Sequence, residues 1–326
     1  MERQLTSGHV CPSSSNFDSR LACELASSVE LASAAQFAFM VLVSAWHNGE
    51  VHMNPDSPTP AFIYGTAWKE DRTASLTELA IQTGFRAIDT ANQRRHYHEA
   101  GVGEALTSVY QSGLVTRKDL FLQTKYTSRG GQDHRLPYDP SAPVSAQVAQ
   151  SMESSLQHLG TDYVDSLVLH GPASGHGWTS SDSEAWEAMI KERDAGRTRM
   201  IGVSNVSITH LRQMAQRHAE APAFVQNRCF ASMAWDNEVR SFCQQQGIIY
   251  QGFSLLTANW ELVRHPSFID LAGQLGATPA QVVFAFARAV GILPLTGTSD
   301  AEHMKEDLAS ANVTLPTELV SQLSLV

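Results

Sequence analysis

From residue 61 onward, apolar and polar positions alternate between two kinds of segment. One kind is a short apolar run rich in β-branched residues. The other is a longer block whose apolar residues recur three or four positions apart. The short runs predict eight strands, at 61–66, 85–90, 120–125, 163–170, 200–205, 223–227, 248–254 and 292–298. The longer blocks predict helices between them, at 76–83, 100–112, 144–159, 183–193, 208–218, 237–246 and 279–289.

This alternation predicts the fold class. Strands that alternate with helices indicate βαβ units and a parallel sheet covered on both faces. Eight such units in about 250 residues favour an α/β fold of the closed (β/α)8 TIM-barrel type over an open doubly wound sheet. An open dinucleotide-binding sheet would carry GxGxxG after its first strand. Here that strand runs into Gly65 and Thr66, and the pair Gly101 and Gly103 lacks the third glycine.

Glycine and proline mark the ends of the predicted helices. A glycine closes five of the blocks just before a strand, where a left-handed residue commonly ends a helix. These glycines are Gly84, Gly113, Gly160, Gly196 and Gly247. Thr278 and Pro279 begin another helix with a capping hydroxyl and a proline in the first turn.

The first part of the chain does not follow this pattern. It is rich in Ser and Ala, with one weakly helical block at 21–46, and leads into a proline-rich run at 54–60. We therefore expect residues 1–56 to be an extension outside the core fold, and residues 57–326 to form the barrel domain.

Composition excludes several classes of protein. The chain has 326 residues, of which 43% are hydrophobic and 17% charged, which is too apolar for a disordered protein. A net charge of −10 argues against binding to nucleic acid. The longest apolar stretch, at 29–46, is interrupted by Glu30 and Gln36, so no membrane span is expected. Four cysteines without paired spacing indicate a reducing, cytoplasmic compartment and predict no metal site.

Polar side chains stand at the ends of several predicted strands. Asp89, Lys125 and His170 end the second, third and fourth strands. In a barrel, the carboxyl ends of the strands meet at one face, where catalytic residues collect. A single buried charge of this kind is more often part of a structural ion pair. Several polar strand ends at one face instead predict a ligand, because an apolar core would not tolerate so many.

These residue types suit the reduction of a carbonyl group. A buried lysine beside a carboxylate keeps its charge and is expected to lower the pKa of a nearby tyrosine, which then donates a proton. A neutral imidazole adds a hydrogen bond to the same oxygen. Phe253, on the seventh strand, offers a flat face for a pyridine ring. Uncharged groups of the kind that bind a carboxamide are Ser204, Asn205 and Gln226. The combination predicts hydride transfer from a nicotinamide.

Five dispersed segments resemble the aldo-keto reductases. They are YGTAW at 64–68, FRAIDTA at 85–91, LQTK at 122–125, DSLVLHGP at 165–172 and IGVSN at 201–205. The resemblance covers about residues 60 to 326 and implies a (β/α)8 barrel that reduces carbonyl compounds with NADPH. It places the family's catalytic tetrad on Asp89, Tyr97, Lys125 and His170.

The tyrosine departs from the family's spacing. Members usually carry it five residues after the aspartate, where Arg94 stands in this chain. Tyr97 is eight residues after Asp89, and an enlarged loop would bring it to the site. His96 as the acid, or no acid at all, are the alternatives that the sequence leaves open.

The resemblance also implies a set of cofactor-binding residues. These are Gly65, Thr66, Ser204, Asn205, Gln226, Phe253, Ser254, Leu255, Gly297, Thr298, His303 and Asp307. Many relatives hold the 2′-phosphate of NADPH with a Lys and an Arg after the last strand, but 295–303 contains neither. Thr298 and backbone amides are left to receive a phosphate, with help from Lys305, whereas Asp300 and Glu302 oppose it. The expected cofactor is NADP(H), with NAD(H) as the alternative.

A long segment after the third strand, at 127–140, is expected to shape the substrate pocket. Four aromatic residues lie just beyond strand ends and are candidates for its wall: Trp68, Tyr126, Trp178 and Phe230. They predict a bulky, apolar carbonyl substrate, and ordinary loop packing is the alternative for each of them.

One rival function stays open at this level. A catalytically weak or inactive relative that binds nucleotide, and serves as a regulatory or assembly subunit, would fit the displaced tyrosine and the missing basic clamp. A hydrolytic barrel is disfavoured, because no two carboxylates stand at neighbouring strand ends.

Overall fold

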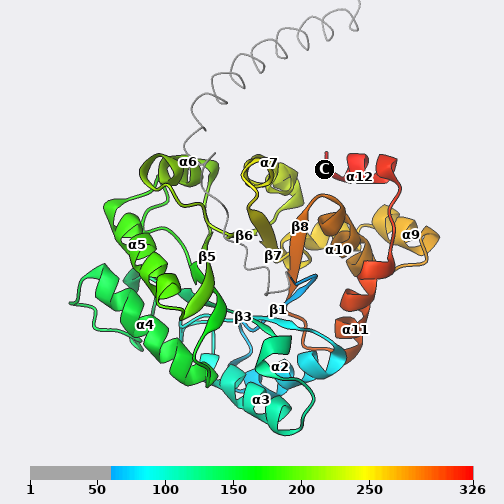
Figure 1. Cartoon of the computed structure of the whole chain (residues 1–326). Helices are drawn as coiled ribbons and strands as arrows, with labels where there is room; N and C mark the ends of the chain where they lie inside the picture. Colours follow the sequence, from blue (N-terminus) through cyan, green and yellow to red (C-terminus); the bar gives the residue numbers. More distant parts are fainter. Residues whose placement is uncertain (1–59, 326) are drawn as a thin grey trace, which may run out of the picture. The chain divides into compact units, whose positions relative to one another are not determined.

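The computed structural model describes residues 60–325, and the predicted extension at 1–56 lies outside the described residues. Eight parallel strands pair in chain order and close into a barrel, since β8 pairs with β1 (Figure 1). The strands are β1 (Ile63–Gly65), β2 (Ala87–Asp89), β3 (Phe121–Tyr126), β4 (Val164–Leu169), β5 (Thr198–Ser204), β6 (Phe224–Arg228), β7 (Ile249–Phe253) and β8 (Ile292–Thr296). Each overlaps a predicted strand, so the predicted (β/α)8 TIM barrel is confirmed.

Helices lie outside this ring of strands (Figure 1). Seven match the predicted blocks: α2 (Thr73–Thr83), α3 (Glu99–Gln111), α4 (Val144–Leu159), α5 (Ser180–Asp194), α6 (Ile208–Arg217), α7 (Asn237–Gln245) and α10 (Pro279–Ala289). Four more were not predicted: α8 (Trp260–Arg264), α9 (Pro266–Gln274), α11 (Ala301–Ala309) and α12 (Thr317–Leu323). These four span between five and nine residues. Among residues 60–325, no helix is both long and apolar enough to cross a bilayer.

The predicted helix ends are confirmed. All five glycines expected to close a helix have positive φ, for example 63° at Gly160 after α4. The side chain of Thr278 accepts a hydrogen bond from the backbone N–H of Gln281 and so caps α10, which has Pro279 in its first turn. These local signals set where each helix turns back toward the barrel.

The glycine pair in α3 serves packing. A Cβ atom on Gly103 would lie 1.8 Å from the carbonyl oxygen of His158 in α4. Glycine therefore lets the two helices approach this closely, which agrees with the absence of a dinucleotide-binding glycine motif at this place.

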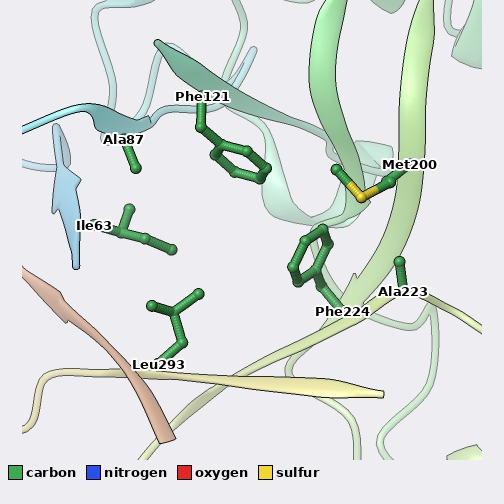
Figure 2. Packing of buried hydrophobic residues seen from close by; sticks show 7 residues of the cluster. All are labelled: Ile63, Ala87, Phe121, Met200, Ala223, Phe224 and Leu293. Carbon is green, nitrogen blue, oxygen red and sulfur yellow. The ribbon is translucent and has the colours of Figure 1, made fainter. Parts of the chain in front are cut away.

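The barrel interior changes from apolar to polar along the strands. A cluster of buried apolar side chains fills its amino-terminal end (Figure 2). It consists of Ile63, Ala87, Phe121, Met200, Ala223, Phe224 and Leu293. Farther along the strands lie three buried glutamines, Gln123, Gln226 and Gln251, which are joined to one another by hydrogen bonds. Gln123 and Gln226 also donate to Asp89 Oδ1, at 2.7 and 3.1 Å. This polar layer supports the site above it.

Candidate active site

A cavity of about 970 Å³ opens at the carboxyl ends of the strands. Most of the residues predicted for the site line it: Gly65, Trp68, Asp89, Tyr97, His170, Ser204, Asn205, Gln226, Phe253, Ser254, Leu255, Gly297 and Thr298. Lys125 is almost wholly buried beside Asp89. The fold therefore brings all four predicted catalytic residues to one place, from strands β2 and β3 and from the segments that follow β2 and β4.

Lys125 is fully engaged by its neighbours. Its Nζ donates to both carboxylate oxygens of Asp89, at 2.7 and 2.6 Å, and to the carbonyl oxygen of Thr90 at 2.8 Å. Burial lowers the pKa of Lys125, and the adjacent Asp89 charge acts in the opposite direction. All three ammonium protons are donated in these hydrogen bonds. Lys125 can therefore influence other groups only through the electrostatic field of its charge.

Tyr97 lies directly beside this ion pair. The Lys125 Nζ is 5.1 Å from the centroid of the Tyr97 ring, and that ring meets the His170 ring edge-on at 5.8 Å between centroids. Burial, together with the charge of Asp89, raises the pKa of the Tyr97 hydroxyl above its usual value. The net direction is opposite to the one expected from Lys125, because burial of the phenol and the Asp89 charge outweigh the lysine. The phenol stays protonated at neutral pH.

His170 is a neutral imidazole. Burial and the nearby Lys125 charge lower its pKa to about 3. Its Nδ1 lies 2.7 Å from the hydroxyl oxygen of Thr127, which directly follows β3. Because Thr127 occupies Nδ1, Nε2 is the ring nitrogen left to meet a ligand, and the ring itself lines the cavity.

Two enlarged loops hold each other and deliver Tyr97. Gln93 Nε2 donates to the carbonyl oxygen of Gly131 at 2.7 Å, and Gln132 Nε2 donates to that of Asn92 at 2.8 Å. Arg94 donates from Nη1 to the carbonyl oxygen of Tyr97 at 3.1 Å. The guanidinium at the family's usual tyrosine position therefore bonds to its own loop, and Tyr97 rather than Arg94 lines the cavity.

The amide and hydroxyl groups at the ends of β5 and β6 offer hydrogen-bonding atoms that are complementary to those of a carboxamide. Asn205 Nδ2 donates to the His170 carbonyl oxygen and to Ser204 Oγ, and Gln226 Nε2 donates to Asp89 and Gln251. The atoms left to meet a ligand are two acceptors, Asn205 Oδ1 and Gln226 Oε1, and one donor, the Ser204 hydroxyl. A carboxamide offers two N–H donors and one oxygen acceptor, so this set fits it.

The first amides of α11 are already bound to a carboxylate of the same helix. Asp300 accepts hydrogen bonds from the backbone N–H groups of Glu302 and His303, at 2.9 and 3.0 Å, and so occupies the start of α11 itself. Lys305 donates to Glu302 at 2.7 Å. The helix amides that a 2′-phosphate would use are thus already bound to a carboxylate.

Three predicted pocket aromatics do not line the cavity. The Tyr126 hydroxyl donates to Gln147 on α4 at 3.2 Å, because Lys125 points inward and its neighbour on the strand must point outward. Trp178 is buried, and its Nε1 donates to Ser183 on α5 at 3.0 Å. Phe230 follows β6 and precedes a 3-10 helix at Ala231–Asp236. The hydrogen bonds of Tyr126 and Trp178 favour ordinary packing for these two, and Phe230 is absent from the cavity lining.

Three residues of the predicted cofactor set also lie outside the cavity lining. The Thr66 hydroxyl is buried and donates to the Asp89 carbonyl oxygen at 3.0 Å. Asp307 is buried and accepts from Thr296 Oγ1 at 2.8 Å, and burial raises its pKa to about 6. His303 is exposed on α11. Thr66 and Asp307 thus form hydrogen bonds to the ends of β2 and β8, respectively.

Sequence reasoning did not select several residues that line the cavity. His96, expected above only as an alternative proton donor, lies against the predicted pocket residue Trp68 with ring centroids 4.1 Å apart and adds a histidine to the aromatic wall. Lys69, Thr127 and Arg228 also line the cavity. For Arg228 a signal was present: a strand that turns Gln226 inward also turns inward the residue two positions later.

Known proteins with similar sequences and structures identify the relatives of this chain. A model described as the aldo/keto reductase family matches residues 62–261. A protein named aldo-keto reductase from Mycolicibacterium vanbaalenii is 32% identical over 259 residues, which cover 79% of this chain and 85% of that protein. Methylglyoxal reductase DkgB of Escherichia coli O157:H7 is 29% identical over 79% of this chain and 90% of its own length.

Solved structures agree with the barrel. The crystal structure of an aldo/keto reductase from Brucella melitensis superposes with a TM-score of 0.70 at 25% identity, and covers 84% of this chain and 97% of its own. An aldo-keto reductase crystallised with NADPH also reaches a TM-score of 0.70, at 21% identity, over 82% of this chain and 84% of its own.

Proposed function

The chain belongs to the aldo/keto reductase family of oxidoreductases, and we propose that it reduces an aldehyde or ketone to an alcohol with hydride from NAD(P)H. The proposal rests on one observation: Tyr97, the neutral His170 and the Lys125–Asp89 pair meet at one side of a single cavity.

Tyr97 is the proposed proton donor. The phenol is protonated at neutral pH, so it can give a proton to the carbonyl oxygen as negative charge develops there. The phenolate formed in this step would lie near the Lys125 ammonium, which stabilises it through the field. His170 would donate a hydrogen bond from Nε2 to the same oxygen and hold the substrate in place.

The carboxamide set is proposed to hold the nicotinamide. Ser204, Asn205 and Gln226 would bind its amide group, and Phe253 would provide the face on which the ring stacks. A bound reduced nicotinamide supplies the hydride that the carbonyl carbon accepts. The other proposed cofactor contacts are Gly65, Ser254, Leu255, Gly297 and Thr298.

For the cofactor we propose NADP(H), with NAD(H) accepted as well. The relative crystallised with NADPH supports the first. The acidic start of α11 supports the second, because Asp300 would repel a 2′-phosphate there. Separate binding titrations with NADPH and NADH measure the preference, and similar Kd values for the two are expected.

We propose a small carbonyl compound as substrate, with an apolar part that would contact Trp68 and His96. One relative is named a methylglyoxal reductase, so small dicarbonyl compounds belong in any substrate panel. A cytoplasmic location remains a prediction from the cysteines.

The test is turnover by the purified chain. Oxidation of NADPH or NADH is followed spectroscopically with methylglyoxal and a series of aromatic aldehydes, and cofactor binding is measured separately by fluorescence quenching. Cofactor binding with turnover supports the reductase. Cofactor binding without turnover of any carbonyl contradicts it, and supports instead the non-catalytic subunit.

A further inference from the structure

We propose that Arg228 forms an anion-binding subsite of the cavity, which takes a phosphate or carboxylate group. Arg228 is the last residue of β6, lies exposed at the cavity wall, and is paired in register with Phe253 on β7. Its guanidinium carbon is 5.6 Å from the centroid of the Phe253 ring. The cation therefore stands beside the aromatic face proposed for the nicotinamide, one inward-facing position beyond Gln226 on the strand.

Arg228 differs from the neighbouring cations in that its only recorded contact among residues 60–325 is with an aromatic ring, that of Phe253. Lys125 is neutralised by Asp89, and Lys69 donates from Nζ to the carbonyl oxygen of Gly297. Within residues 60–325, the Arg228 side chain makes no ion pair and no hydrogen bond. Its five N–H donors are consequently available to a ligand.

The overall charge of the chain favours a ligand as the explanation of this residue. The whole chain carries a net charge of −10, so a cation facing the cavity does not reflect a generally basic surface. A guanidinium presents two parallel N–H groups, which match the paired oxygens of a carboxylate or a phosphate. Two sources of such a group fit: the pyrophosphate common to NADH and NADPH, and a carboxylate on the carbonyl substrate. This inference rests on the proposed function, because the first source is the proposed cofactor and the second is the proposed substrate.

The experiment compares Arg228→Met with Arg228→Lys, and uses Arg264→Met as a matched control. Arg264 is an exposed arginine on α8 outside the cavity lining. Melting temperatures first establish that each variant is folded. The first arm measures Kd for NADPH and for adenosine diphosphate, which carries a pyrophosphate without a nicotinamide. The second arm measures kcat/KM for 4-carboxybenzaldehyde and for its neutral methyl ester.

We expect Arg228→Met to weaken one of these interactions about fivefold to tenfold, as for a charged hydrogen bond at a partly exposed site. Arg228→Lys should lose less, and Arg264→Met should lose nothing. Weaker binding of both nucleotides assigns the anion to the cofactor, whereas a selective loss for the carboxylated aldehyde assigns it to the substrate.

Values equal to those of Arg264→Met in both arms would overturn the proposal. The first arm needs no turnover, so the subsite is tested even if the chain reduces no carbonyl compound. Failure of the subsite and failure of the proposed function are thus distinguishable.

Discussion

At the scale of single residues, the site depends on how its charges are compensated. Lys125 donates two hydrogen bonds to the carboxylate of Asp89 and a third to the carbonyl oxygen of Thr90. The lysine can therefore keep its charge while buried, although burial lowers its pKa. Tyr97 lies beside both charges of this pair, and the Lys125 ammonium, 5.1 Å from the centre of its ring, is placed to stabilise the negative charge that develops on the phenol during the reaction.

Lys125→Met tests this role of the lysine. The variant removes the charge that stabilises the developing phenolate, so turnover should fall by at least about 10²-fold. The Kd for cofactor should stay within the range of the wild type, because Lys125 lies beneath the cavity wall. Steady-state kinetics and a fluorescence titration on the same preparation provide both values. Unchanged turnover would remove the lysine from the mechanism.

Thr127 determines the tautomer of His170, the residue proposed to hydrogen-bond to the substrate together with Tyr97. Its hydroxyl lies 2.7 Å from His170 Nδ1, and our account requires the hydroxyl to donate, so that Nε2 carries the proton facing the substrate. Nitrogen-15 NMR of the imidazole should report the Nε2–H tautomer in the wild type and in Thr127→Ser.

Thr127→Val is the matched change, since it has nearly the same shape without the hydroxyl. We expect mixed tautomers and a lower kcat with unchanged cofactor Kd, and recovery in Thr127→Ser. An Nδ1–H tautomer in the wild-type protein would show that the threonine accepts the hydrogen bond instead, and His170 could then not donate to the substrate.

At the scale of elements, the sequence predicted the eight strands because short apolar, β-branched runs mark them, and seven helices because their apolar residues recur three or four positions apart. It did not predict α8, α9, α11 or α12, which are short. Nor could it reveal which side of a loop an aromatic residue faces. Tyr126 turns away from the cavity because Lys125 before it turns inward, a consequence of strand alternation once the register is known. Trp178 packs on α5 and lies outside any strand, so strand alternation does not predict which way its side chain points.

Gly103 tests the close packing of α3 on α4. Gly103→Ala places a methyl group against the carbonyl oxygen of His158, which would force the helices apart and destabilise the fold by about 1–3 kcal/mol. Gly273→Ala in α9 is the control, because a Cβ there meets nothing within 4 Å. It should leave the melting temperature unchanged or slightly higher. Equal melting temperatures for the two variants would contradict this account of the glycine.

At the scale of the whole molecule, the closed barrel turns scattered motifs into one site. Asp89, Lys125 and His170 were predictable because the carboxyl ends of parallel strands must meet. Tyr97 could be selected only from the resemblance, because the loop that carries it is held by Gln93 and Gln132 across two insertions. Contacts between two irregular loops leave no periodic signal in a sequence.

The barrel closes entirely within the described residues, since β1 begins at Ile63 and pairs with β8. A chain that starts at Met53 contains all eight strands. We therefore predict that deletion of residues 1–52 leaves melting temperature, cofactor affinity and turnover at the values of the full chain. Calorimetry and steady-state kinetics on both proteins measure this. A large loss of melting temperature would place the deleted segment in the stable core.

The central claim is that Tyr97 gives the proton. The most direct measurement is the rate of hydride transfer in a single turnover, with NADPH and an aldehyde that the wild type reduces, for Tyr97→Phe and Arg94→Ala. Tyr97→Phe removes the hydroxyl and little volume, so the rate should fall by roughly 10²-fold or more with cofactor Kd preserved. Arg94→Ala loses one hydrogen bond to the Tyr97 backbone and should be far less affected. A normal rate for Tyr97→Phe together with a severe loss for Arg94→Ala would contradict the assignment of the acid.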